Sequence, residues 1–143
     1  MMKTVCRITG MLALALLAAQ IGRAQEPVLA NIPFAFTAGN MTLPAGEYRV
    51  EKVQNSSPAL LIRRTDGSAY MIVMTSAVQV NAPQKQTKLI FHHYANGYFL
   101  SQVWAEGNTR GRELPKSAKE KEQALLARNE TPDQVTIVAR LIP

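Results

Sequence analysis

Cysteine is almost absent from this chain, which limits how its fold can be held together. The only cysteine, Cys6, lies near the N-terminus, and residues 25–143 contain none. Those 119 residues can therefore form neither a disulfide framework nor a cysteine-ligated metal site. A segment of this length can bury enough apolar surface to be stable without cross-links, so we expect a packed apolar core.

Histidine is equally scarce, and its placement argues against a metal site. His92 and His93 are the only two, and they are adjacent in the sequence. Neighbouring side chains on a strand point to opposite faces, so this pair cannot ligate one ion together. The segment Gly107–Gly111 also lacks the pattern of a phosphate-binding loop. We expect neither a metal ion nor another cofactor.

Long apolar runs are missing as well. The run Met11–Ala19 is well short of the roughly 20 residues that a membrane-spanning helix needs. Lys3 and Arg7 precede it, and Gly22-Arg23-Ala24 follows with small residues at the positions that a signal peptidase reads. This pattern predicts a secretory signal peptide over residues 1–24, with cleavage after Ala24.

Cleavage at this position would leave residues 25–143 as a single β-rich domain without a transmembrane segment. The protein would be exported, to the periplasm or the extracellular space. Removing Lys3, Arg7 and Arg23 from the sixteen basic residues leaves thirteen against ten acidic ones, a net charge of +3. The remaining basic residues are interspersed with acidic ones, which is typical of a solvated surface, so we expect no nucleic-acid partner.

Short alternating segments dominate the rest of the chain. Tyr48 and Val50 alternate with charged residues, and Asp66-Gly67 joins two apolar runs in a predicted hairpin. The C-terminal segment alternates in the same way through its last apolar residues, and loops rich in Gly, Asn and Pro separate the segments. One such loop is expected over Glu106–Gly111. Seven or eight short strands at this spacing predict an all-β fold, either a small antiparallel barrel or a two-sheet sandwich.

One helix is expected, at about residues 117–128. Ser117 with Glu120 three residues later forms a capping-box pattern, and the following residues lack Gly, Pro and β-branched side chains. Its apolar positions make only a thin stripe that includes Leu125 and Leu126. We therefore expect the helix to lie on the surface of the sheets or to close one end of them.

The stretch Thr87–Trp104 predicts the central hairpin. It contains two strand-like runs joined by Ala95-Asn96-Gly97, and an Asn-Gly turn between β-branched and aromatic runs is a strong hairpin signal. The stretch also contains the only tryptophan and both histidines.

Four segments, in this order after a signal peptide, resemble a family of small exported bacterial proteins known only as uncharacterised. They are N-I-P-F-A-F (31–36), L-P-A-G-E-Y (43–48), Y-F-L-S-Q-V-W (98–104) and G-R-E-L-P-K-S (111–117). The resemblance covers most of residues 25–143 and implies export and a small domain. It implies no activity, ligand or catalytic residue.

A serine–histidine pair depends on the register of the central hairpin. With the two-residue loop Asn96-Gly97, Tyr94 pairs with Phe99 and His92 stands opposite Ser101, at a distance suited to a hydrogen bond. A small hydrolase using His92 and Ser101 is therefore the alternative functional hypothesis.

With the three-residue loop Ala95–Gly97, Tyr94 pairs with Tyr98 and His92 faces Leu100 instead. In either register a regular strand lacks the exposed elbow and oxyanion donors that a nucleophile needs. We therefore favour a polar pair on a solvated face over a catalytic site.

Candidate ligand-binding residues are of two kinds. Tyr94, Tyr98 and Trp104 could form a stacking platform for sugars, although alternation predicts that some of these rings belong to the core. Arg110 and Arg112 follow a glycine-containing loop and could clamp an anionic group, while a structural role for Arg112 is the favoured interpretation.

These observations favour a non-enzymatic function. Export, a core that needs no cross-links and the lack of a coherent catalytic set predict an all-β module. We expect it to bind a partner protein, a glycan or another component of the cell envelope.

Overall fold

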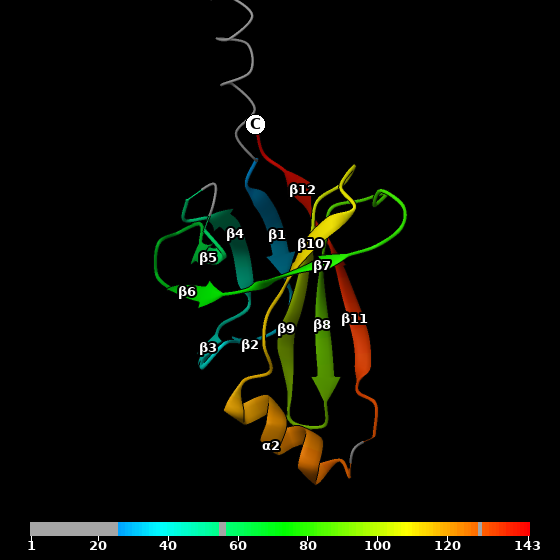
Figure 1. Ribbon diagram of the computed structural model, residues 1–143. Helices are drawn as coiled ribbons and strands as arrows, with labels where there is room; N and C mark the ends of the chain where they lie inside the picture. The colour runs from blue at the N-terminus through cyan, green and yellow to red at the C-terminus, as the bar shows by residue number, and fades with distance from the viewer. Residues whose placement is uncertain (1–25, 55–56, 129) are drawn as a thin grey trace, which may run out of the picture.

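The structure is a computed structural model that describes residues 26–54, 57–128 and 130–143. The predicted signal peptide and Cys6 lie outside these residues. The described residues form twelve strands and one helix (Figure 1). They are β1 Val28–Ile32, β2 Phe36–Ala38, β3 Met41–Leu43, β4 Gly46–Lys52, β5 Ala59–Arg64, β6 Tyr70–Met74, β7 Ser76–Gln79, β8 Lys88–Tyr94, β9 Gly97–Trp104, β10 Arg110–Glu113, α2 Ala118–Leu126, β11 Asp133–Val138 and β12 Arg140–Leu141.

The strands form two sheets, which confirms the all-β prediction and selects the sandwich over the closed barrel. One sheet has the order β12-β1-β4-β5-β6, and the other has the path β11-β8-β9-β10-β7 with the short strands β2 and β3 attached to it. Every pairing between described strands is antiparallel except a single parallel contact between β2 and β9. The number of strands exceeds the seven or eight expected, because several are only two to four residues long.

The chain passes from one sheet to the other at both lateral edges of the sandwich. Thr75 separates β6 of the five-stranded sheet from β7 of the seven-stranded sheet, and Ala139 separates β11 from β12 in the same way. In Figure 1, β6 and β7 appear as one long ribbon crossing the front of the molecule. Bends of this kind link two sheets without closing a barrel.

One apolar core lies between the sheets, as the alternating segments predict. Tyr48 and Val50 of β4 are buried, and the partly buried Val135 and Ile137 pack against the same cluster. Aromatic rings fill the part of the core nearest the β8–β9 turn. Phe36, for example, meets the rings of Tyr48 and Phe91 edge to face at 5.1 and 5.5 Å.

The β8–β9 hairpin forms, but near its turn it has neither of the two registers predicted from its sequence. Beyond the turn, Lys88–Ile90 pair in the register of the three-residue loop, with Leu89 opposite Val103. The turn itself consists of residues 95–96, and Gly97 is already paired with Tyr94. His92 therefore lies opposite Phe99, and neither pairing expected for this histidine is present.

A β-bulge explains the unexpected register. Phe91 pairs with Leu100 and Leu89 with Val103, and the register shifts between these pairs so that Ser101 has no partner across the ladder. The two core residues of β8 are two positions apart, whereas those of β9 are three apart. One extra residue in β9 is needed to keep all four side chains facing the core.

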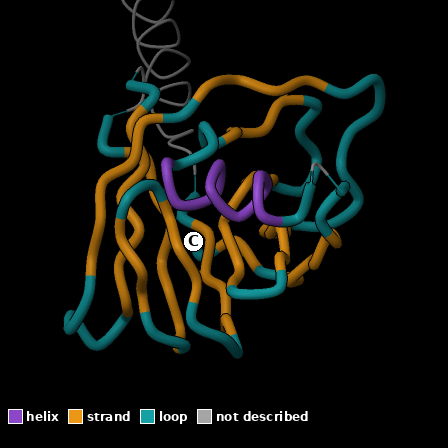
Figure 2. Tube along the Cα trace, turned by 90° about the horizontal axis from the view of Figure 1, so that it is seen from below, coloured by secondary structure: helices purple, strands orange, loops and turns teal. Residues whose placement is uncertain are grey.

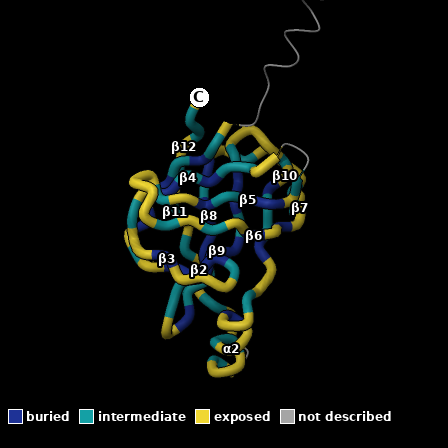
Figure 3. The backbone as a smooth tube through the Cα atoms, turned by 90° about the vertical axis from the view of Figure 1, so that its left-hand side faces the viewer, coloured by how far each residue is buried: buried dark blue, intermediate teal, exposed yellow. Residues whose placement is uncertain are grey.

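The helix begins where the capping pattern predicts, but its apolar stripe does not face the protein. The Ser117 hydroxyl accepts a hydrogen bond from the Glu120 amide at 3.1 Å. Leu125 and Leu126 are 72% and 67% exposed, and the buried side chain of α2 is that of Glu120. Figure 2 shows the helix lying across one end of the strands, and in Figure 3 most of it is coloured as exposed.

Candidate functional site

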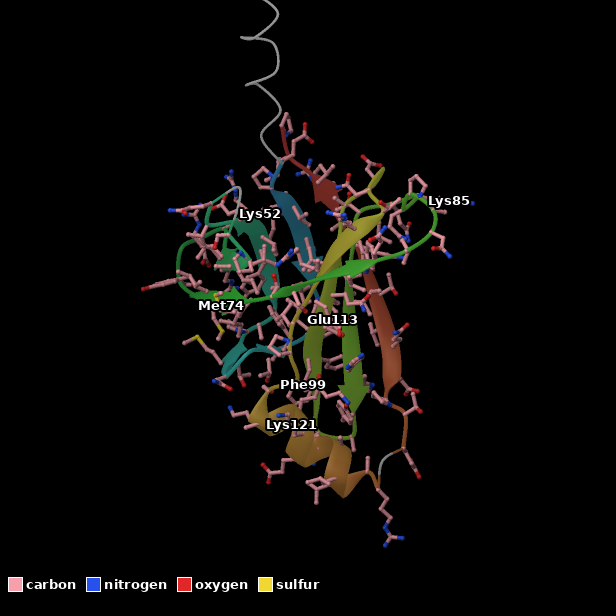
Figure 4. All side chains as sticks on the ribbon, viewed as in Figure 1. Lys52, Met74, Lys85, Phe99, Glu113 and Lys121 are labelled. Atoms are coloured by element: carbon pink, nitrogen blue, oxygen red, sulfur yellow. The ribbon has the colours of Figure 1, made fainter. Side chains whose placement is uncertain are left out.

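A cavity of about 670 Å³ lies between the two sheets. Strands β1, β4 and β5 line it from one sheet, and β7, β9 and β10 line it from the other. Its volume falls within the range typical of pockets that bind small ligands. In Figure 4, the labelled Lys52, which also lines the cavity, lies at the end of β4 far from helix α2.

Small aliphatic side chains form the inner wall of the cavity. Val28, Val50, Leu60 and Val103 are buried core residues that also line the cavity, and the half-buried Leu141 joins them. None of the described aromatic residues lines it. The core ring of Phe36 contacts those of Tyr48 and Phe91 outside this lining, so aliphatic side chains form the inner wall and space remains between the sheets.

Charged side chains of both signs also line the cavity. The acidic ones are Glu26, Glu51 and Glu106, and the basic ones are Lys52, Arg110 and Arg112. Charged and aliphatic residues both line the cavity because side chains alternate along a strand. A residue next to a core position in β4, or at the end of a strand, therefore reaches solvent. An aliphatic interior beside charged groups is suited to a ligand with an apolar body and a polar end.

Arg112 is bound to the protein itself. Its Nε donates to the Thr75 hydroxyl at 2.8 Å, and its Nη2 donates to the Thr75 carbonyl oxygen at 3.1 Å. The Thr75 hydroxyl in turn donates to the carbonyl of Pro58 at 2.6 Å. Arg112 therefore fastens the crossing between β6 and β7. This is a structural role, as favoured from the sequence, and the partner is a threonine.

Arg110 has a different environment, although both arginines line the cavity. It is exposed, and it pairs across the ladder with Gln79 of β7. Among the described residues, no ion pair involving Arg110 is present. Of the two arginines predicted to clamp an anionic group, only Arg110 therefore has a guanidinium that could contact a ligand at the cavity.

The three candidate aromatic residues do not form a common platform. Tyr94 and Trp104 are buried, and Trp104 donates its indole N–H to Gln102 at 2.9 Å. Tyr98 is half-buried and stacks between Phe34 and His93, with ring centroids 3.8 and 4.1 Å away. None of the three lines the cavity, and burial leaves Tyr94 and Trp104 without a face to offer a sugar.

A second group of polar side chains lies where helix α2 covers strand β8. Glu120 Oε1 is 3.5 Å from His92 Nδ1, and the Glu120 side chain is almost fully buried. Glu120 Oε2, His92 Nδ1 and the Tyr94 hydroxyl are buried atoms with no hydrogen-bond partner in the described part of the chain. Burial, and then the nearby Glu120 carboxylate, raise the pKa of Tyr94.

Glu120 is the residue of this group that sequence reasoning missed. The capping-box pattern suggests that its side chain turns back toward Ser117, but the side chain instead reaches His92 of the sheet. The weakness of the helix's apolar stripe was the only hint that a polar residue faces inward.

Ser101 is buried at the β-bulge. It does not pair with His92, and neither residue lines the cavity between the sheets. The structure thus supplies an acid beside His92 but does not give the predicted Ser101–His92 pairing.

Within residues 26–54, 57–128 and 130–143, no three His, Cys, Asp or Glu side chains gather as they would around a metal ion. No helix in this part of the chain has the length and apolarity to cross a membrane. Comparison with protein-family models, with curated proteins and with solved structures found no match.

Proposed function

We propose that the protein is a non-catalytic, exported binding module that takes the aliphatic part of a cell-envelope amphiphile into the cavity between its sheets. The observation that carries this proposal is the cavity of about 670 Å³ with an inner wall of Val and Leu side chains. Flexible aliphatic chains suit such a wall, since each buried methylene contributes about 0.8 kcal/mol.

The lining also distinguishes among the expected partners. Sugars are commonly recognised by stacking on aromatic faces, and within residues 26–54, 57–128 and 130–143 no aromatic residue lines this cavity. A glycan is therefore a weaker candidate than an amphiphile. Arg110 is the group best placed to contact an anionic head group, because Arg112 is already bonded to Thr75.

Isothermal titration calorimetry with dodecanoate, below its micelle concentration, tests the proposal. Ala105 is half-buried and lines the cavity, so Ala105→Trp should fill it. The matched control is Ala35→Trp, at an exposed loop position outside the cavity. Losing several methylene contacts should weaken dodecanoate binding by about tenfold or more in Ala105→Trp and leave the control unchanged.

The proposal fails if dodecanoate does not bind, or if Ala105→Trp binds it as tightly as the control does. Maltose serves as the polar comparison. Binding of maltose in preference to dodecanoate would favour a glycan partner and contradict the aliphatic ligand.

One observation favours hydrolysis as a second candidate function. The Glu120 carboxylate lies 3.5 Å from His92 Nδ1, where an acid could orient the imidazole of a general base. Turnover of p-nitrophenyl acetate by the purified protein, abolished in His92→Ala, would support it. His93→Ala is the matched control, because His93 stacks on Tyr98 away from Glu120. Equal rates in the two variants would eliminate this candidate.

A further inference from the structure

Strand β6 is an uncovered edge of the five-stranded sheet. It pairs with β5 on one side, and no described strand pairs with it on the other. An open groove of about 600 Å³ lies between the start of β6 and the segment Met41–Pro44. Strand β3, whose residues line the other side of this groove, does not pair with this edge.

The register with β5 shows which backbone groups of β6 face the open side. The Arg64 amide donates to the Ala69 carbonyl, and the Thr75 amide donates to the Pro58 carbonyl. Antiparallel strands alternate, so residues 69, 71, 73 and 75 bond to β5. The N–H and C=O groups of Tyr70, Ile72 and Met74 accordingly point to the open edge.

The same three residues expose apolar side chains. Tyr70, Ile72 and Met74 are 64%, 55% and 60% exposed, and Figure 4 shows the labelled Met74 at the side of the molecule. The segment from Ala69 to Gln79 contains no charged residue. Natural edge strands usually carry lysine, proline or a bulge that discourages pairing, and β6 has none of these.

We propose that the β6 edge binds the β6 edge of a second copy of this chain, antiparallel and about a two-fold axis at Ile72. This register places Ile72 opposite Ile72 of the other copy and Tyr70 opposite Met74. All three pairs are hydrogen-bonded pairs, because each residue directs both backbone groups to the edge. The strand is thus complementary to itself in backbone, shape and polarity.

Charge is compatible with this pairing. Arg63, opposite Tyr70 on β5, is the charged residue nearest to the exposed row. In the dimer, the Arg63 side chains of the two copies are at least three strand spacings apart, about 14 Å. That separation exceeds the Debye length of about 8 Å at physiological ionic strength, so their repulsion is largely screened.

Buried area determines how strong the dimer is. Stable interfaces bury roughly 800 Å² on each partner, and three partly exposed side chains cannot supply that area. We therefore expect a weak dimer that forms reversibly as the protein concentration rises.

Sedimentation velocity over a range of concentrations tests the association. The average mass of the wild-type protein should rise toward that of a dimer, whereas Ile72→Lys should remain monomeric. Leu125→Lys is the control, since it places the same charge on another exposed apolar residue, in helix α2. Met74→Lys gives an independent variant if Ile72→Lys does not fold.

Cysteine cross-linking tests the register. In a Cys6→Ser background, Ile72→Cys places two Cα atoms about 5.5 Å apart across the axis, within the range of a disulfide. Tyr70→Cys places them four residues apart along the strand, about 14 Å, and should not cross-link. Equal cross-linking by both variants contradicts the proposed register. Wild-type protein that stays monomeric at every concentration contradicts the proposal. An edge that binds only an extended peptide of another protein would give this result, so it would also contradict the proposal.

Discussion

Two buried tyrosines of this protein differ in whether their hydroxyl groups are satisfied. The Tyr48 hydroxyl donates to the Pro44 carbonyl at 2.6 Å, whereas the buried Tyr94 hydroxyl has no hydrogen-bond partner among the residues that the structure describes. A satisfied hydroxyl stabilises the fold, and an unsatisfied buried one opposes it. Removing the hydroxyl group from each tyrosine therefore compares a hydrogen-bonded environment with an unbonded one.

We predict opposite effects of Tyr48→Phe and Tyr94→Phe on stability. Tyr48→Phe should lower the free energy of unfolding by about 1–2 kcal/mol, because it leaves the Pro44 carbonyl without this donor. Tyr94→Phe should leave it unchanged or raise it by about 1 kcal/mol. Urea denaturation measures both, and an equal loss in the two variants would contradict the environment described for Tyr94.

The same tyrosines predict how stability changes in alkaline solution. Burial raises the pKa of both phenols, and the Glu120 carboxylate raises that of Tyr94 further. Below about pH 10 the folded and unfolded chains both keep these protons, but above it the unfolded chain loses them first. Stability should therefore fall as the pH rises through the raised values. Between about pH 9 and 11, the denaturation midpoint should fall less steeply with pH in the double variant Tyr48→Phe/Tyr94→Phe than in the wild type. Equal slopes in the two proteins would refute this prediction.

Sequence reasoning identified part of the candidate site at the level of single residues. Arg110 and Arg112 were selected because they follow a loop, and both line the cavity. The aliphatic wall could not be assigned, since a valine that lines a cavity has the same sequence pattern as one in a filled core. The partnership of Glu120 with His92 also depends on how the helix rotates, which a weak apolar stripe does not determine.

Among the strands, β10 begins inside the loop expected over Glu106–Gly111, because Arg110 and Gly111 belong to the strand. Gly111 explains why it can pack as a strand, because a Cβ atom there would lie 2.7 Å from the Trp104 ring and 2.9 Å from the Val103 carbonyl oxygen. The glycine that suggested a loop instead permits close approach to the only tryptophan. The same contact buries Trp104 and removes it from the surface.

We predict that Gly111→Ala destabilises the fold by about 1–3 kcal/mol, because backbone and ring must both move. Gly97→Ala is the matched control, since its added Cβ would meet only the Phe99 ring, at an ordinary 3.6 Å. Thermal unfolding followed by Trp104 fluorescence measures the change. An unchanged melting temperature in Gly111→Ala would contradict the close packing of β10 on β9.

The helix permits a test of its capping and of its orientation. Ser117→Ala removes the acceptor of the Glu120 amide and should cost about 1 kcal/mol. Leu125→Ala should cost much less than a core leucine, because this side chain is 72% exposed. Chemical denaturation compares the two, and a loss of several kcal/mol in Leu125→Ala would show that the apolar stripe faces the sheets.

In the molecule as a whole, the alternation of apolar and polar residues predicted the fold class but not the strand order. The pairing of β7 with β10 joins segments that are far apart in sequence, and no local pattern encodes it. The bulge at Ser101 has a similar origin, because it reconciles core spacings that belong to two different strands. Such features depend on how the two sheets meet, and the cavity between them depends on the same arrangement.

Nuclear magnetic resonance can locate the binding site directly. In a titration of the ¹⁵N-labelled protein with dodecanoate, we predict that amide shifts concentrate at Val50, Leu60, Val103 and Arg110, around the inter-sheet cavity. Phe36 and Phe91, in the aromatic part of the core, should shift little. Shifts concentrated instead around His92 and Glu120, or no saturable shifts at all, would contradict the assignment of the cavity as the ligand site.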